Sequence, residues 1–316
     1  MKALFFDNEL KLIDYPKPER GRNEATIRVV LAGICSTDLE IIKGYKGFKG
    51  ILGHEFVGVV EACDNRELLG KRVVGEINCA CGECNYCVQG LKTHCKERSV
   101  LGVLNHHGAF AEYLVLPEDN LYPVPDKIAD EEAVFIEPLA AAFQITEQLK
   151  IRPSDQVIVL GDGKLGLLGA QVLALTGCNL LVAGKHPQKL SIARDRGIET
   201  SLIADFDERK VDVVIECTGS PKGLETALGL TRPGGTIVLK STVAGNRELD
   251  LTPLVVNELT LTGSRCGPFD PAIRALEKGL IHVKPLISGI YRMSDGINAF
   301  QEASRRDVLK ILVMMD

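Results

Sequence analysis

The sequence predicts an α/β protein with two domains, one rich in β-strands and one built on a doubly wound parallel sheet. Residues 1 to about 138 hold short β-branched runs separated by Gly, Pro and Asn, whereas strand-like and helix-like segments alternate from about residue 151. The chain has 316 residues with 45% hydrophobic content, which is enough for two separate cores.

The first region is typical of a β-rich, barrel-like domain. The chain opens with a strand-like run in MKALFF, and the later strand-like runs are ATIRVVLAG, FVGVVEAC, KRVVGEI and AEYLVLP. Turn-forming residues bound these short runs, and helix signals between them are few.

The second region begins with a β-α-β unit. The strand-like run QVIVL leads into GDGKLG, then into the apolar-periodic LGLLGAQVLALTG and a second strand, NLLVAG. The alternation continues through QKLSIARDRG, VDVVIECTG, KGLETALGLT, GTIVLKST and ELTLTGS, which predicts a parallel sheet. After about residue 267, two helical stretches and a final strand, DVLKILVMM, are expected to return to the first domain.

A glycine-rich turn between the first strand and helix of this unit predicts a dinucleotide site. Glycines in a Gly-x-Gly-x-x-Gly pattern permit a tight turn and let backbone N–H groups approach a pyrophosphate. A glycine-rich turn without a ligand is the alternative. The expected binding residues are Gly161, Gly163, Lys164, Leu165 and Gly166 in the turn, Gly184, Lys185 and His186 after the second strand, and Thr218 and Gly219 after VDVVIEC.

The residues at the end of the second strand predict the form of the dinucleotide. An NAD-preferring site usually carries Asp or Glu there, to accept hydrogen bonds from the adenosine ribose. This sequence has Gly184, Lys185 and His186 instead. Because no carboxylate of this segment repels a 2′-phosphate and Lys185 attracts one, NADP(H) is predicted over NAD(H). If Lys185 is only a solvated loop lysine, the preference stays open.

Four closely spaced cysteines predict a structural zinc site. Cys81, Cys84, Cys87 and Cys95 lie on one glycine-containing loop, CGECNYCVQGLKTHC, and offer four thiolates for a closed tetrahedral site. A tetrathiolate iron–sulfur cluster and metal-free thiols are the alternatives.

A second, dispersed set of residues predicts an open metal site. Cys35 lies in GICSTDLE, His54 and Glu55 lie in GHE, and Glu137 lies in FIEPLAAA. A thiolate, an imidazole and a carboxylate would hold zinc with a position open for substrate. Each residue also has a structural interpretation: Cys35 as a small core side chain, His54 as a turn histidine, and Glu137 as a helix-start carboxylate.

Charge and hydropathy narrow the class of partner. The formal net charge of −5 argues against a protein that binds the phosphate backbone of a nucleic acid. The N-terminus lacks the apolar core of a signal peptide, and no run approaches the roughly 18 apolar residues of a membrane span. A cytoplasmic location is expected. In that reducing compartment, the ten cysteines of the chain are expected to serve metal binding rather than disulfides. The substrate is expected to be small.

The ordered occurrence of GICSTDLE, LGHEFVGVVEAC, the four-cysteine loop, GAFAEYLVLP, GDGKLG, ECTGS and PGGTIVL resembles the zinc-containing medium-chain alcohol dehydrogenase family, in particular its polyol, threonine and glucose dehydrogenases. The resemblance runs nearly end to end. It implies a GroES-like catalytic domain over residues 1–138 and 268–316, a Rossmann domain over 139–267, and substrate binding in the cleft between them.

The resemblance also implies roles for single residues. Cys35, His54 and Glu137 would bind a catalytic zinc, with Glu55 binding directly or exchanging with water. Thr37 would pass the substrate proton outward, and Asp38 would accept the other ring N–H of the zinc-bound histidine.

The implied activity is hydride transfer between NAD(P) and a secondary alcohol or sugar alcohol, with two zinc ions per chain and a homodimer or homotetramer. A quinone or enone reductase without active-site zinc and a non-catalytic dinucleotide sensor are the competing interpretations.

Overall fold

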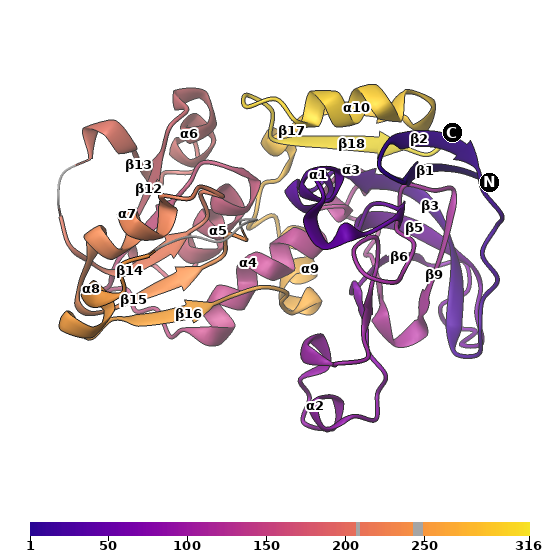
Figure 1. Cartoon of the computed structure of the whole chain (residues 1–316), viewed down its shortest axis with the longest axis horizontal. Helices are drawn as coiled ribbons and strands as arrows, with labels where there is room; N and C mark the ends of the chain where they lie inside the picture. The colour runs from indigo at the N-terminus through magenta and orange to yellow at the C-terminus, as the bar shows by residue number, and fades with distance from the viewer. Residues whose placement is uncertain (207–208, 243–248) are drawn as a thin grey trace. The chain divides into compact units, whose positions relative to one another are not determined.

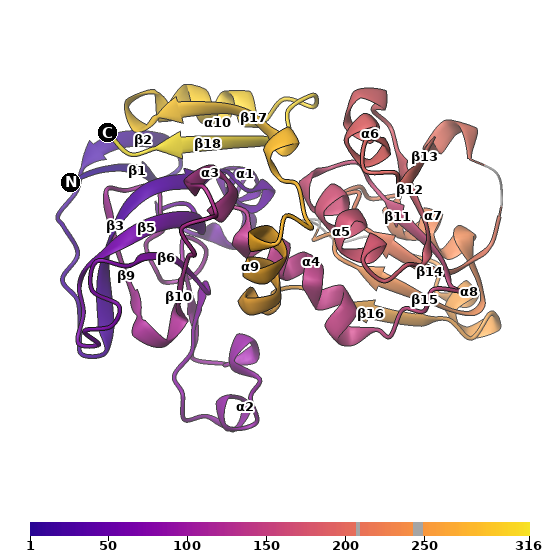
Figure 2. The ribbon, with the colours of Figure 1, turned by 180° about the vertical axis from the view of Figure 1, so that it is seen from behind.

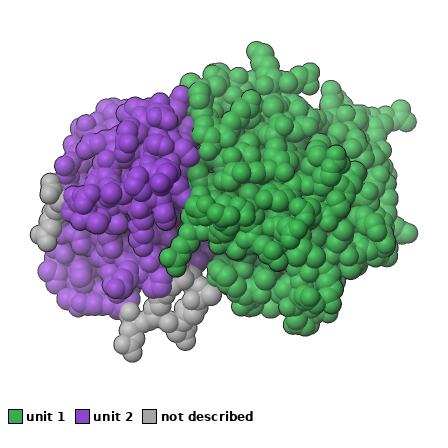
Figure 3. Space-filling view, turned by 90° about the horizontal axis from the view of Figure 1, so that it is seen from above, with its two compact units in different colours: residues 1–137, 273–316 green, residues 138–272 purple. Residues whose placement is uncertain are grey.

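The computed structural model describes residues 1–206, 209–242 and 249–316, and the chain divides into two compact units, coloured separately in Figure 3. Unit 1 comprises Met1–Glu137 and Ile273–Asp316, and unit 2 comprises Pro138–Ala272. The sequence-based division has its breaks after residues 138 and 267. The predicted fold class, a β-rich domain and a parallel-sheet domain, is confirmed.

Unit 1 contains a seven-stranded sheet and a smaller three-stranded one (Figure 1). The larger sheet has the order β10 (Leu121–Pro123), β6 (Arg72–Gly75), β5 (Glu55–Ala62), β3 (Glu24–Gly33), β18 (Lys310–Met314) and β17 (Ile287–Arg292), with β9 (Tyr113–Pro117) also paired to β3. The smaller sheet has the order β2 (Leu10–Asp14), β1 (Lys2–Phe6) and β4 (Gly50–Ile51). Short strands β7 (Asn78–Cys79) and β8 (Ser99–Val100) pair at the base of the cysteine loop.

The C-terminal segment, which was expected to return to the first domain, contributes two strands to the larger sheet of unit 1. β18 pairs antiparallel with β3, with Leu312 opposite Gly33. The neighbouring strand β17 was not expected, because its run ISGIYR is interrupted by Gly289 and is only half-buried on one face. The helices assigned to this unit or to its boundary are α1 (Ser36–Ile42), α2 (Asn85–Val88), α3 (Asp130–Ala133), α4 (Ile136–Gln148), α9 (Phe269–Glu277) and α10 (Gly296–Ala303).

Unit 2 is built on a six-stranded parallel sheet. Its order is β13 (Glu199–Leu202), β12 (Asn179–Gly184), β11 (Gln156–Leu160), β14 (Val211–Glu216), β15 (Thr231–Leu239) and β16 (Thr260–Gly263). Helix α5 (Lys164–Ala174) packs on β11 and β12, α6 (Pro187–Arg194) packs on β12 and β13, and α7 (Gly223–Leu230) packs on β14 and β15, as Figures 1 and 2 show from opposite sides. A short helix, α8 (Thr252–Val256), precedes β16.

The core of this sheet is apolar and almost fully buried. Ile158, Val214 and Ile237, from three neighbouring strands, belong to one cluster of buried side chains. Continuous apolar runs of this kind made the central strands predictable. The edge strand β13, with the sequence ETSL, carries no such pattern and was missed.

In the described part of the chain, no helix is long and apolar enough to cross a membrane.

Candidate metal and dinucleotide sites

Strand pairing in unit 1 brings Cys35, His54 and Glu55 together. Gly33 at the end of β3 lies opposite Glu55 at the start of β5, so the residue that caps α1 and the residue that precedes β5 become neighbours. One ligand atom from each of the three side chains lies within 4.8 Å of the other two. Both His54 and Glu55 are buried. This set of sulfur, nitrogen and oxygen donors suits zinc.

Asp38 holds the backbone on both sides of this group. Its buried carboxylate accepts the backbone N–H of Cys35 at 2.8 Å and the backbone N–H of Gly53 at 3.1 Å. Asp38 Oδ1 lies 3.3 Å from His54 Nδ1, and among the described residues Nδ1 has no partner that meets hydrogen-bond geometry. Acceptance of the ring N–H by Asp38 stays a prediction.

The charges around His54 favour a cation at this site. Burial opposes a charge on the imidazole, yet Asp38 and Cys35 beside it raise the pKa of His54 well above its ordinary value. A bound metal ion would meet the same need for positive charge as a proton on the ring.

A lysine that the sequence analysis missed contacts the group. The ammonium of Lys310, from β18, pairs with Glu55 Oε2, and both side chains are buried. Burial opposes the charge of Lys310, whereas Glu55 and Cys35 raise its pKa. The signal in the sequence was a single lysine inside the apolar run KILVM, which is expected to be a buried strand.

Glu137 and Thr37 border this group. Glu137 is the second residue of α4, and its carboxylate is not within 4.8 Å of all three donors. Burial raises its pKa to about 7, with opposing effects from the charges of His54 and Glu55. Thr37 Oγ1 lies 3.8 Å from Cys35 Sγ. Ligation by Glu137 and proton transfer by Thr37 stay predictions.

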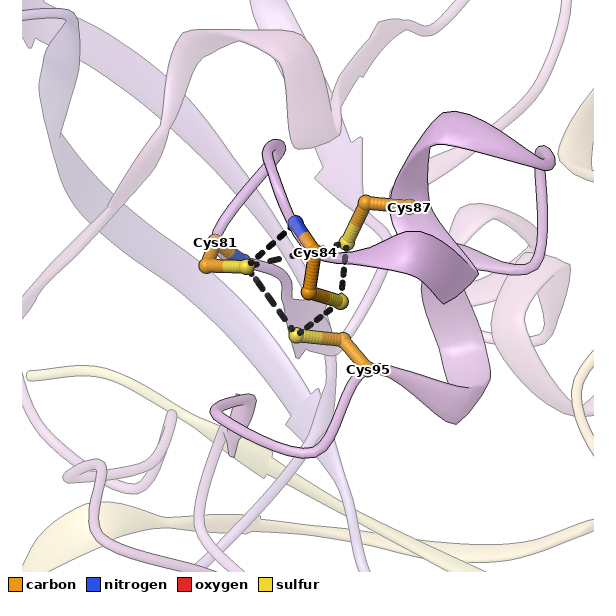
Figure 4. Close-up of side chains that lie close together, drawn as sticks. All are labelled: Cys81, Cys84, Cys87 and Cys95. Atoms are coloured by element: carbon orange, nitrogen blue, oxygen red, sulfur yellow. Dashed lines mark hydrogen bonds between the residues drawn. The ribbon is translucent and has the colours of Figure 1, made fainter.

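The four cysteines of the loop converge on one point (Figure 4). Their sulfur–sulfur distances are 3.5 Å for Cys84–Cys87 and Cys81–Cys95, 3.8 Å for Cys84–Cys95 and 3.9 Å for Cys81–Cys87. Zinc–sulfur bonds of about 2.3 Å place the sulfurs of a tetrahedral site about 3.8 Å apart. The loop therefore fits a single tetrahedral ion, and it leaves no room for the irons and sulfides of a cluster.

The protonation of these thiols also points to a metal. A backbone N–H from Cys87 lowers the pKa of Cys84 to about 6, whereas burial raises the pKa of Cys87 to about 12. Backbone N–H groups of Cys81 and Cys84 lie 3.4 Å from the sulfurs of Cys95 and Cys81. Because thiolates in contact repel one another, a divalent cation bound between them would stabilise their ionised form.

The predicted dinucleotide residues lie at one edge of the parallel sheet in unit 2. Gly161 follows β11, Gly184 ends β12, and Thr218 and Gly219 follow β14; β12 and β14 flank β11. Gly161 has a φ of +116°, and a side chain there would meet the Cys217 carbonyl at 2.8 Å. Gly163 is the N-cap residue of α5, and Lys164, Leu165 and Gly166 form its first turn. A pyrophosphate can therefore be bound by the backbone N–H groups at the start of this helix.

The end of β14 is fixed by a buried carboxylate. Glu216 accepts the backbone N–H of Thr218 at 2.7 Å and also its hydroxyl, while the backbone N–H of Gly219 donates to Ser241 Oγ at 2.8 Å. The turn after this strand is therefore ordered by side chains of unit 2 itself.

A carboxylate that the sequence analysis did not include lies at the end of β12. Asp162, between the first two glycines of the turn, accepts the backbone N–H groups of Lys185 at 2.7 Å and His186 at 2.6 Å. The sequence prediction of NADP(H) assumes no carboxylate at this place, so its premise differs from the structure. An acidic residue inside the glycine pattern was the available signal.

Comparisons with known proteins agree with this architecture. Residues 21–126 match the alcohol dehydrogenase GroES-like domain, and residues 165–278 match the zinc-binding dehydrogenase domain. The chain is 30% identical to the starvation-sensing protein RspB of Escherichia coli (strain K12), with 99% of each chain covered. It is 27% identical to a sorbitol dehydrogenase of Bacillus subtilis (strain 168), covering 99% of this chain and 97% of that protein.

A solved structure shows the same fold throughout. The crystal structure of a short chain alcohol dehydrogenase, RspB, from E. coli CFT073, complexed with cofactor NADH, superposes with a TM-score of 0.91 at 29% identity, covering 99% of both chains. The chain is accordingly an NAD(P)-dependent oxidoreductase and belongs to the zinc-containing medium-chain alcohol dehydrogenase family.

Proposed function

We propose that this protein transfers a hydride between a nicotinamide dinucleotide and the carbinol carbon of a secondary alcohol or sugar alcohol, or reduces the matching ketone or aldehyde. The observation that carries the proposal is the group of Cys35, His54 and Glu55, whose donor atoms lie within 4.8 Å of one another. The similarity to a sorbitol dehydrogenase supports a polyol as the substrate class.

In this proposal the two cysteine-containing sites have different roles. Cys35 and His54 hold a catalytic zinc, with Glu137 as the third protein ligand and Glu55 binding directly or exchanging with water. When bound there, zinc supplies a Lewis acid that lowers the pKa of an alcohol hydroxyl toward neutrality. The four thiolates of the loop hold a second zinc that leaves no open coordination position and only orders the loop.

Other residues of the chain then position the zinc ligands, the proton acceptor and the dinucleotide. Asp38 fixes the backbone of Cys35 and Gly53, and so fixes the segments that carry both zinc ligands. Thr37 accepts the proton of the alcohol and passes it outward. In unit 2, the backbone N–H groups at the start of α5 hold the pyrophosphate of the dinucleotide. Assembly into a dimer or tetramer is proposed from the family resemblance alone.

Two proposals exist for the dinucleotide. Lys185 and the lack of an acidic residue on β12 favour NADP(H), as the sequence predicts, whereas the Asp162 carboxylate favours NAD(H).

Metal content per chain and a substrate panel test the proposed function. Elemental analysis should give two zinc ions per chain. With NAD(H) or NADP(H) present, turnover of polyols, secondary alcohols or their ketones should change the absorbance of the reduced dinucleotide at 340 nm. Cys35→Ala should retain one zinc and lose turnover. One zinc in the native protein with activity only on conjugated enones would instead identify a reductase without active-site zinc. Dinucleotide binding without turnover of any of these compounds would identify a sensor.

A further inference from the structure

The side chain of Asp162 occupies the space into which a side chain at the end of β12 would point. A Cβ atom added to Gly184 would lie 2.6 Å from Asp162 Cβ and Oδ2 and 2.7 Å from its Cγ. Contacts this short leave no room for both side chains. A carboxylate from the glycine-rich turn therefore lies at the end of β12, where an NAD-preferring site usually carries one from the strand, and the absence of a side chain at Gly184 makes room for it.

Hydrogen bonds hold this carboxylate in place. Oδ2 accepts the backbone N–H groups of Lys185 and His186, and His186 Nδ1 lies 3.1 Å from both carboxylate oxygens. These bonds outweigh burial and lower the pKa of Asp162, so it is ionised at neutral pH. Since an ionised carboxylate offers about four acceptor positions, Oδ1 retains capacity for a hydroxyl donor.

The opposing cation is less effective than this carboxylate. The side chain of Asp162 is 10% exposed, whereas Lys185 is exposed to solvent. Water and salt screen an exposed ammonium strongly and a buried carboxylate weakly. The backbone N–H groups of Lys185 and His186 already donate to Asp162, so they are not available to a 2′-phosphate. Any positive charge on His186 faces the same carboxylate.

We propose that Asp162 selects the dinucleotide: it accepts a hydrogen bond from the adenosine ribose and repels a 2′-phosphate, so the protein prefers NAD(H) to NADP(H). The inference rests on the proposed dinucleotide site of unit 2. It reverses the preference that follows from residues 184–186 alone.

Fluorescence titration with NADH and NADPH measures this preference directly. The native protein should bind NADH at least tenfold more tightly than NADPH, and Asp162→Asn, which keeps the shape but removes the charge, should shift the ratio of the two dissociation constants at least tenfold toward NADPH. Asp195→Asn is the matched control, because it removes one negative charge from an exposed position beyond α6. Its ratio should stay within twofold of native.

A relocated carboxylate separates selection from a general effect on folding. Asp162→Gly alone should lose discrimination, and the double variant Asp162→Gly/Gly184→Asp, which returns the carboxylate to β12, should recover it at least tenfold. Tighter binding of NADPH by the native protein, or an unchanged ratio in both Asp162 variants, would overturn the inference. If the native protein binds neither dinucleotide, the proposed function itself fails.

Discussion

The ammonium of Lys310 and the carboxylate of Glu55 form an ion pair in which both side chains are only 1% exposed. The two residues are 255 positions apart in the chain, and they lie on β18 and β5, which flank β3 in the larger sheet of unit 1. Such a pair adds little net stability over an apolar pair, but losing one partner leaves a buried charge without compensation.

Lys310→Met should therefore lower the free energy of unfolding by about 3–5 kcal/mol. Urea denaturation measures this change, with a chelator present so that no metal ion takes the place of the ammonium beside Glu55. Lys284→Met is the matched control, since Lys284 is 66% exposed and 3.9 Å from Glu132. It should cost at most about 1 kcal/mol. The double variant Lys310→Met/Glu55→Gln should recover part of the loss. Equal stability of the two single lysine variants would contradict this account.

Asp212 should stabilise unit 2 at neutral pH, and this contribution should be lost in acid. Its carboxylate accepts the backbone N–H of Gln156 at 2.7 Å and faces the Arg232 guanidinium at 2.6 Å, and these contacts hold its pKa below the ordinary value of 3.8. A depressed pKa stabilises the folded state above the unfolded pKa, and this contribution disappears as the pH falls through the folded pKa. Asp212→Asn should thus be less stable than native at pH 7, with the difference shrinking below about pH 4.

Urea unfolding at several pH values measures this difference. Asp195→Asn, at an exposed position of the same unit, should show no comparable pH-dependent loss. A destabilisation by Asp212→Asn that stays constant from pH 7 to pH 3 would mean that the charge of Asp212 does not matter.

Features that depend on local sequence could be predicted. Cys81, Cys84, Cys87 and Cys95 lie on one loop, so their spacing sufficed to predict that their sulfurs meet. The glycine turn was predictable because Gly161 directly follows an apolar strand. By contrast, Cys35 and His54 meet only through the register of β3 and β5, and the family resemblance was needed to connect them.

The residues that were missed act across the fold. Lys310 reaches Glu55 because β18 joins the sheet next to β3, a pairing that no local pattern specifies. Asp162 reaches the end of β12 because parallel strands place their carboxyl ends at one edge. Sequence patterns predicted the central strands of the parallel sheet, but not which side chain fills a space between two elements.

Loss of a cysteine should have a different effect at each of the two metal sites: it should lower Tm at the four-cysteine loop and abolish turnover at the Cys35 site. Cys84→Ser removes one thiolate from a closed site whose binding free energy contributes to folding, and a loss of about 3 kcal/mol corresponds to a fall in Tm on the order of 10 °C. Cys35→Ala removes a partly exposed ligand at the start of α1, so it should abolish turnover while Tm changes by less than about 3 °C. Differential scanning calorimetry and zinc content of both variants test the contrast, each variant being expected to retain one zinc. Equal thermal destabilisation would show that the division into a structural and a catalytic site is wrong.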